Sequence, residues 1–275
     1  RSTALPTGGT SPYTYQWEYS QDQLTWQSIT PAQNASALSA TYTFNGTFDL
    51  VSATRYYRRK ATNTGVTKPS ASVFVSVNAL PNVLITAESD VIPPGGTNVL
   101  TASGGTGTYT WYIGSTSASP ESNTTPTYTI GLGVQTGQVT YIAKGTSAAG
   151  CENTYSKTIT VAPIIPGTIG TSQNICEGST SVAQLTSSTS ASGGSGSSYG
   201  YQWKRKVGTG AWSAIVGATQ ETYQPTFPSG FTTTTQYVRV VTNRGVKDST
   251  NVVTYSYVSK PVITVAATGQ PGSTV

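Results

Sequence analysis

A short pattern that alternates aromatic and polar residues occurs three times along the chain, each time after a pair of glycines. In the first copy it runs from Gly8 to Trp17 and reads Gly-Gly-Thr-Ser-Pro-Tyr-Thr-Tyr-Gln-Trp. A period of two is typical of a strand with one buried face, because successive side chains point to opposite sides. The tryptophan of each copy is therefore predicted to be a core anchor, at Trp17, Trp111 and Trp203.

The spacing of these tryptophans predicts the domain organisation. They lie 94 and 92 residues apart, and several short strand-like segments follow each of them. Repeats of this length without capped helical segments predict an all-β chain of tandem immunoglobulin-like β-sandwich domains in an extended array. We expect domains at 1–79, 80–162 and 163–259, with residues 260–275 forming the first strand of a further domain.

The two ends of the chain indicate a longer repeat. Residues 1–7 lead directly into the first glycine turn, so the first domain is expected to lack its first strand or strands. The segment Pro261–Val265 is similar to Pro81–Ile85, and Pro271–Thr274 is similar to Pro94–Thr97. Joined head to tail, the two ends read as one uninterrupted strand and turn. We therefore expect the chain to be one three-domain period of a longer array, with an arbitrary boundary as the alternative.

Composition excludes several classes of protein. Charged residues make up 9% of the chain, the net charge of +5 is scattered, and there is no His. Because His is the usual general base and a common metal ligand, we expect no enzyme, no metal site and no cofactor. Basic residues form only two short tracts, Arg55–Lys60 and Lys204–Lys206, which we interpret as solvated strand faces. Without a basic stripe we expect no nucleic-acid partner, and without a long apolar run no membrane span.

At this point the motifs match a known family. The pattern of Gly-Gly, Tyr-Gln-Trp, Trp-x-x-Ile and Thr-x-Tyr-Tyr-Arg-Arg resembles the Ig-like and PKD-like repeats of giant Bacteroidota cell-surface proteins. It looks most like the repeats of the gliding-motility adhesin exported by type IX secretion. The resemblance covers essentially the whole chain and implies an extracellular, cell-surface segment that acts as stalk and contact surface in adhesion or gliding.

The same resemblance bears on the two cysteines, since the family often pairs a Cys in an Ile-Cys-x-Gly turn with one in a Gly-Cys hairpin. Here Cys176 and Cys151 lie in different domains, so each lacks its partner within the domain. A disulfide needs Cα atoms within about 7 Å, and the strands and prolines between these two residues separate them widely. We expect free, buried thiols.

Two further tryptophans are the candidate ligand contacts. Trp26 and Trp212 each follow the anchor tryptophan by nine residues and are expected nearer an edge of the sheet. Packing against the sheet is the first interpretation of both side chains, and contact with surface polysaccharide or another substratum is the alternative. A filament would instead bind neighbouring copies. The alternatives to an adhesin are a carbohydrate-binding accessory module of a secreted enzyme and a purely structural fibre subunit.

Overall fold

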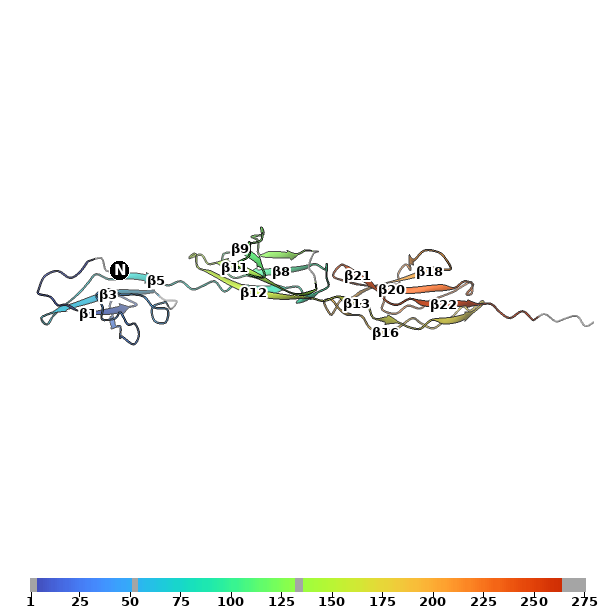
Figure 1. Ribbon diagram of the computed structural model, residues 1–275, viewed down its shortest axis with the longest axis horizontal. Coiled ribbons are helices and arrows are strands. Elements are labelled where there is room, and N and C mark those ends of the chain that lie inside the picture. Colours follow the sequence, from blue (N-terminus) through green and yellow to red (C-terminus); the bar gives the residue numbers. More distant parts are fainter. Residues whose placement is uncertain (1–3, 51–53, 132–135, 264–275) are drawn as a thin grey trace, which may run out of the picture. The chain divides into compact units, whose positions relative to one another are not determined.

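The computed structural model describes residues 4–50, 54–131 and 136–263. Every regular element in these ranges is a β-strand (Figure 1). The chain divides into two compact units, Arg1–Asn82 with Gly145–Asn153, and Val83–Lys144 with Thr154–Val275. The expected strand of a further domain at 260–275 lies outside the described residues from position 264 onward.

In the first unit, five strands form one antiparallel sheet. The order is β2-β1-β3-β4, and β5 also pairs with β3. The alternating stretch at Trp17 is the central strand β1. Its inner face packs on an irregular segment between β2 and β3, which supplies Tyr42 and Phe48. The bounds are β1 Thr14–Ser20, β2 Gln27–Ser28, β3 Thr54–Asn63, β4 Val66–Pro69 and β5 Val73–Ser76.

In the second unit, the first part has two sheets that face each other across a core. One sheet has the order β10-β8-β6, and the other β7-β12-β11-β9. Trp111 on β9 is fully buried in a core that also contains Leu100 of one sheet and Ile159 of the other. The bounds are β6 Leu84–Ala87, β7 Val91–Ile92, β8 Asn98–Ser103, β9 Tyr109–Ile113, β10 Thr127–Ile130, β11 Gly137–Thr146 and β12 Glu152–Val161.

The remaining strands of the second unit surround a separate core that includes Trp203, Phe231 and Tyr255. The larger sheet has the order β15-β22-β20-β18-β19, with β21 on β20, and two pairs, β13-β17 and β14-β16, complete the strands. The bounds are β13 Ile164–Ile165, β14 Thr168–Ile169, β15 Gln173–Cys176, β16 Ser187–Thr189, β17 Ser192–Gly193, β18 Gly200–Val207, β19 Ser213–Ala214, β20 Thr235–Asn243, β21 Val246–Ser249 and β22 Val253–Val258.

Two hairpins beside these cores have the same two-residue turn. Thr64 and Gly65 connect β3 to β4 with φ values of 47° and 82°, and Arg244 and Gly245 connect β20 to β21 with 46° and 83°. Two consecutive positive φ values define the turn whose twist matches that of the strands. The sequence Asn-x-Gly-Val thus fixes the register of both hairpins. The chain is all-β and built of immunoglobulin-like sandwiches, as the repeats predict.

Candidate functional site

The anchor tryptophans share one environment in all three copies. Each indole is buried, and its Nε1 donates a hydrogen bond to a main-chain oxygen at 2.9–3.0 Å. Each ring packs on a tyrosine, and that tyrosine packs on a second tyrosine from the strand next to the tryptophan strand. The ring centroids are 5.2–6.0 Å apart. The three aromatic triads are Trp17–Tyr42–Tyr57, Trp111–Tyr128–Tyr141 and Trp203–Tyr223–Tyr237.

The glycine pair before each tryptophan strand is held by a tyrosine hydroxyl. In every copy the first tyrosine of the repeated motif donates to the carbonyl of the first glycine, as Tyr13 to Gly8, Tyr109 to Gly104 and Tyr199 to Gly193. An asparagine at the end of the neighbouring strand binds the same loop in two copies. Asn243 donates to Ser197 O at 2.8 Å and accepts from the Ser195 amide at 2.9 Å. Asn63 donates to Thr10 O and Pro12 O.

A glutamine beside the tryptophan performs a similar task. Gln16 Nε2 donates to Trp17 O and Ile29 O, both at 2.8 Å, and so ties β1 to the edge strand β2. Gln202 Nε2 makes the corresponding bonds to Trp203 O and Ile215 O at 2.9 Å. In these two copies the glutamine of the repeated motif therefore binds main-chain oxygens.

Two arginines are buried opposite the tryptophans. Arg59 pairs with Trp17 across the sheet, and Arg239 pairs with Trp203. Arg59 reaches the carbonyl of Ala40, and its guanidinium lies 5.0 Å from the ring centroid of Tyr15. The interpretation of the basic tract at residues 55–60 as a solvated face is wrong for Arg59. It follows Tyr57 by two residues, so both side chains point to the same buried side of β3.

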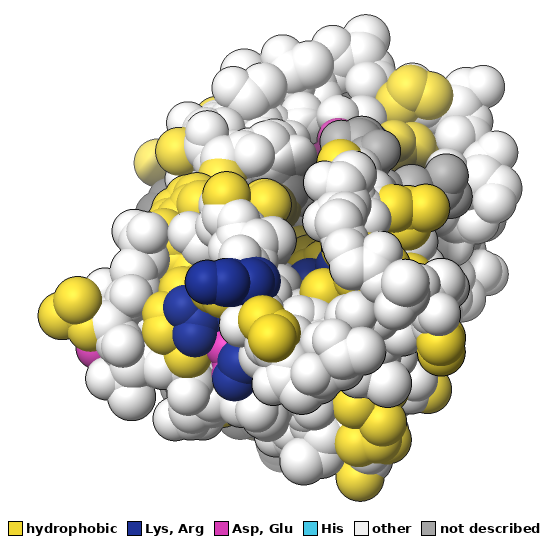
Figure 2. Space-filling model, turned by 90° about the vertical axis from the view of Figure 1, so that its left-hand side faces the viewer, with side chains coloured by type: hydrophobic (Ala, Val, Ile, Leu, Met, Phe, Trp, Pro, Cys, Tyr) yellow, Lys and Arg dark blue, Asp and Glu magenta, His cyan; other side chains and the backbone are white. Residues whose placement is uncertain are grey.

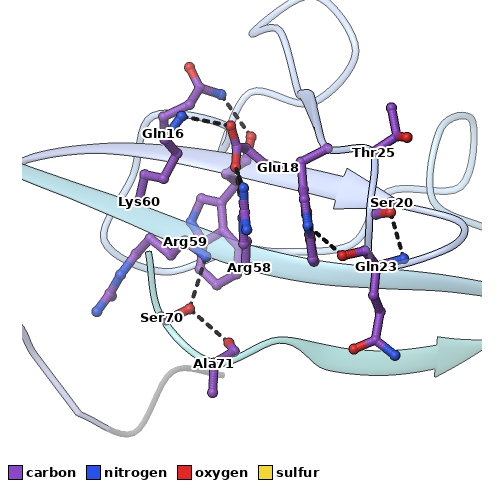
Figure 3. A network of polar contacts seen from close by, with 12 residues as sticks. Gln16, Glu18, Ser20, Gln23, Thr25, Arg58, Arg59, Lys60, Ser70 and Ala71 are labelled. Carbon is purple, nitrogen blue, oxygen red and sulfur yellow. Dashed lines mark hydrogen bonds and ion pairs between the residues drawn. The ribbon is translucent and has the colours of Figure 1, made fainter. Parts of the chain in front are cut away.

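On the other face of the same sheet, Glu18 lies between Arg58 and Lys60 (Figure 3). Together with Trp26, which contacts Arg58, these residues are called the Trp26 cluster. Glu18 accepts from Arg58 at 2.8 Å and from Lys60 at 2.9 Å, which leaves its carboxylate buried under the two cations. The guanidinium of Arg58 lies 4.0 Å from the ring centroid of Trp26. The indole is half-buried, and its Nε1 donates to Gln23 O at 3.0 Å.

The electrostatics of this cluster follow from its contacts. Burial by itself raises the pKa of Glu18, but the hydrogen bonds and charges of Lys60 and Arg58 outweigh it and lower that pKa below its ordinary value. Two cations around one carboxylate leave one positive charge beside an aromatic ring. Such a surface can contact hydroxyl-rich or acidic groups through stacking and hydrogen bonds.

Next to the cluster lies a shallow pocket of about 150 Å³, lined by residues that include Tyr19, Asp22 and Gln27. Asp22 Oδ1 accepts from the amides of Thr25 at 2.8 Å and Leu24 at 2.9 Å. These bonds lower the pKa of Asp22 to about 2, so it is a carboxylate at any ordinary pH.

Trp212 differs from Trp26. It directly precedes the edge strand β19 as Trp26 precedes β2, but its side chain is 39% exposed. The residue after each anchor tryptophan identifies the equivalent positions on the neighbouring strand. Glu18 pairs with Arg58, and Lys204 pairs with Val238, so Val238 takes the place of Arg58. The structure therefore brings Trp26 together with a cation and leaves Trp212 with an open indole surface.

The sequence reasoning missed a buried carboxylate in the first unit. Asp49 is almost fully buried and accepts hydrogen bonds from the hydroxyls of Tyr42 at 2.8 Å and Tyr57 at 3.0 Å, and from Asn34 Nδ2 at 2.8 Å. Burial, together with the Asp49 carboxylate, raises the pKa of Tyr57 to about 12. The sequence contained a signal for this contact. Tyr57 is the tyrosine of the repeated strand, and the hydroxyl of a tyrosine corner forms a hydrogen bond to a group a few residues upstream.

Both cysteines are free, as predicted, but neither is buried. Cys176 is exposed because Ile175 occupies the inward position of β15, and the next residue of a strand faces outward. Cys151 is partly exposed after the turn at Gly150.

Within the ranges 4–50, 54–131 and 136–263, no cluster of three or more His, Cys, Asp or Glu side chains is placed to hold a metal ion. In the same ranges no helix has the length and apolar character needed to cross a membrane. The face drawn in Figure 2 is mostly white and yellow, with basic side chains gathered in one place beside an acidic one.

The fold and its repeated contacts define a protein of tandem immunoglobulin-like domains. The chain belongs to the family of a domain of unknown function, DUF8696, whose sequence profile matches residues 1–79 and 165–259. The matched segments contain the two buried arginines, whereas the corresponding residue in the middle segment, two after Tyr141, is Ala143.

Comparison with solved structures gives distant likenesses. The three N-terminal domains of the Highly Immunogenic Outer Capsid protein (Hoc) of bacteriophage RB49 are 16% identical, with a TM-score of 0.37, over 93% of this chain and 91% of that one. Domains A168–A170 of titin are 17% identical, with a TM-score of 0.31, over 76% and 74%. The FN1–FN3 domains of chicken CNTN1 are 11% identical, with a TM-score of 0.29, over 90% of both chains. No curated protein sequence matches the chain.

Proposed function

We propose that the chain is a repeat segment of an extracellular cell-surface adhesin or filament, in which it acts as stalk and multivalent contact surface. One observation carries this proposal: the polar side chains that recur between copies bind main-chain oxygens. The tryptophan indoles, the glycine-loop tyrosines and the glutamines Gln16 and Gln202 all do so.

These bonds support a mechanical role. They fix the two loops that flank each tryptophan strand and, in the first and third copies, also the neighbouring edge strand, so each module holds its own shape. We expect proline-containing segments to join such modules, for example those at 80–162 and 163–259. A displacement of one module would then be passed on to the next. Many weak contacts from repeated modules add up to strong attachment when the sites can bind at the same time.

The resemblance of the motifs supports the finer assignment. We assign the segment to a Bacteroidota surface protein exported by type IX secretion and active in gliding motility. Its partners would be surface polysaccharide or another substratum, and neighbouring copies in a filament. The low content of charged residues suits contact with hydrated neutral polymers, since few charges need to lose water at the interface.

The test uses cells of the source organism. An antibody against this chain should label intact cells, and a strain from which the segment is deleted should attach to glass or polysaccharide less well and glide less. Labelling that requires permeabilised cells would overturn the surface location. Normal attachment and gliding without the segment would overturn the adhesive role.

Trp212 favours a second candidate, a carbohydrate-binding module of a secreted enzyme. An exposed indole is the usual stacking partner of a sugar ring, and here more than a third of the side chain is open. Binding of the whole chain to one defined glycan, lost in Trp212→Ala but kept in Val216→Ala, would favour this candidate. Weak binding to many polymers, shared by both variants, would favour the adhesin.

A further inference from the structure

Two lysines of strand β18 lie on one face of their sheet. Lys204 and Lys206 are separated by Arg205, and successive residues of a strand point to opposite faces. Arg205 pairs across the sheet with Tyr237, which is buried in the core, so the two lysines are on the face that points away from the core. Residues two apart on a strand are separated by about 7 Å, which places the two ammonium groups side by side.

The indole of Trp212 belongs to the same face. Ser213 pairs with Arg205, and Trp212 directly precedes Ser213, so the indole lies on the side of the two lysines. Trp26 shows the same placement in the first unit, where its ring contacts Arg58 on the face away from the core. The two lysines and the exposed indole are called the Trp212 face.

The Trp212 face has no carboxylate at the position where the Trp26 cluster has one. In the first unit Glu18 occupies the place of Lys204 and neutralises two cations on the neighbouring strand. In the third copy the neighbouring strand carries Val238 and Val240 at the places of those cations. The positive charges therefore lie on β18, beside an indole that no guanidinium covers.

The three carboxylates of residues 163–259 are engaged elsewhere. Glu177 accepts from a main-chain amide at 3.0 Å, and Glu221 accepts from Ser187 Oγ at 2.8 Å. Asp248 pairs with the fully buried Val241 and so lies on the core side of the sheet. The same range has six Lys and Arg, so it carries +3 of the net charge of +5. Among the residues that the structure describes, neither lysine of the Trp212 face forms an ion pair, and an anion between them would relieve their repulsion.

We infer that the Trp212 face binds an acidic polysaccharide, with the indole stacked on a sugar ring and the two ammonium groups bonded to its carboxylates. Aromatic rings offer an apolar face to a sugar, and hydrogen bonds between ammonium and carboxylate are about twice as strong as neutral ones. A polymer of uronic acids uses both features, whereas a neutral glycan uses the indole alone. A nucleic acid fits less well, because its binders gather many Lys and Arg into one stripe.

The inference rests on the proposed function, since it names the class of polymer that one module contacts. The test is binding of the whole chain to polygalacturonate, with the fully methyl-esterified polymer as the matched neutral control. Wild type should bind the acid form at least about tenfold more tightly. This advantage should fall as salt rises, because ions screen exposed charges. Equal binding of the two polymers, or binding of neither, overturns the inference. The adhesive role is decided separately by the deletion strain.

Variants on one strand distinguish a site from general attraction by net charge. Lys204→Gln and Lys206→Gln should each weaken binding of polygalacturonate about tenfold. Arg205→Gln removes the same charge from the opposite face and should bind as wild type does. Trp212→Ala should weaken binding of both polymers. Equal losses in the three charge variants overturn the inference. Single-stranded DNA that competes for the same face and binds more tightly than polygalacturonate also overturns it, because the ligand would then be a polyphosphate.

A measurement on wild type covers variants that do not fold. Amine-reactive labelling with mass spectrometry reports the reactivity of each lysine in the intact chain. Polygalacturonate should slow the labelling of Lys204 and Lys206 and leave that of Lys68, an exposed lysine of the first unit, unchanged. The methyl-esterified polymer should slow the labelling of these lysines far less. Equal slowing at all three lysines would contradict the inference.

Discussion

Arg239 lies directly opposite Trp203 across strands β18 and β20, and its side chain is fully buried. Its guanidinium donates to Glu221 O at 2.7 Å and to Ser187 Oγ at 2.5 Å, and it lies 4.9 Å from the ring centroid of Tyr201. Burial lowers the pKa of this arginine, but a guanidinium keeps its charge in proteins. A charge in the core of a sandwich thus connects three segments that are far apart in sequence.

We predict that Arg239→Ala destabilises its sandwich by about 3 kcal/mol or more, because it leaves a cavity and removes the donors from buried oxygens. Arg239→Met should lose less, since it keeps much of the volume and removes the cost of a desolvated charge. Urea unfolding with hydrogen exchange of β20 peptides measures the effect on this sandwich alone. Arg205→Ala, on an exposed side chain of the same sheet, is the control and should change little.

Equal losses in the alanine and methionine variants would contradict this account. They would mean that the hydrogen bonds of the guanidinium, and not the filling of space, supply the whole contribution.

A second prediction concerns the glycine pair. A Cβ on Gly194 would lie 2.5 Å from Asn243 Oδ1, and the residue has a φ of 54°. Gly196 has a φ of 72°, but a Cβ there would meet nothing within 4 Å. Gly196→Ala should therefore cost only the strain of a left-handed residue, about 1 kcal/mol. Gly194→Ala should cost clearly more, because the asparagine that holds the loop must also move.

The measurement is urea unfolding of both alanine variants, alone and combined with Asn243→Ala. Removing the asparagine should bring the costs of the two glycine substitutions close together. If the difference between them persists in the Asn243→Ala background, the contact with the asparagine is not its cause.

Some of this architecture could be predicted from sequence alone. The strand at Trp111 and the equivalence of Tyr57 and Tyr237 follow from patterns within a few residues, which report which side of a strand is apolar. The contacts of the buried Arg239 do not follow in this way. Its partners at Pro166, Ser187 and Glu221 come from other parts of the chain, and nothing local indicates that they converge.

The candidate site shows the same limit. The nine-residue offset identifies Trp26 and Trp212 as a pair, but their surroundings differ because the strand opposite carries Arg58 in one copy and Val238 in the other. That difference depends on strand register. The buried Asp49 likewise depends on Asn34 and Tyr42, which belong to an irregular segment without periodicity.

The Glu18 cluster predicts a dependence of stability on pH. The folded state holds the pKa of Glu18 below its ordinary value of 4.5, so the ionised carboxylate stabilises the folded form. This contribution is complete above about pH 4.5 and is lost as the pH falls through the lowered pKa. Glu18→Gln should cost about 1 kcal/mol at neutral pH, because the partner cations are partly exposed, and should flatten the pH profile in the acid range.

Urea unfolding between pH 7 and pH 3, followed by hydrogen exchange of β1 and β3, measures this difference. Asp248→Asn, on an exposed hairpin residue, is the control and should keep the wild-type profile in this sheet. A glutamine variant with an unchanged acid profile would show that Glu18 has the same pKa in the folded and unfolded chain.

The last prediction separates the two classes of tryptophan. Trp111→Ala should destabilise its sandwich by about 3–5 kcal/mol, because a fully buried indole leaves a large cavity and an unpaired Thr125 carbonyl. Trp212→Ala should change stability by about 1 kcal/mol or less and remove much of the fluorescence that acrylamide quenches. Trp26→Ala should lie between them, since it loses the contact with Arg58, about 0.5–1 kcal/mol, and part of its packing.

Hydrogen exchange of the three sheets that contain these tryptophans measures the loss of stability, and acrylamide quenching of the folded chain measures the exposure of each indole. A Trp212 variant that loses as much stability as the Trp111 variant would assign Trp212 to packing and remove it as a contact for ligands.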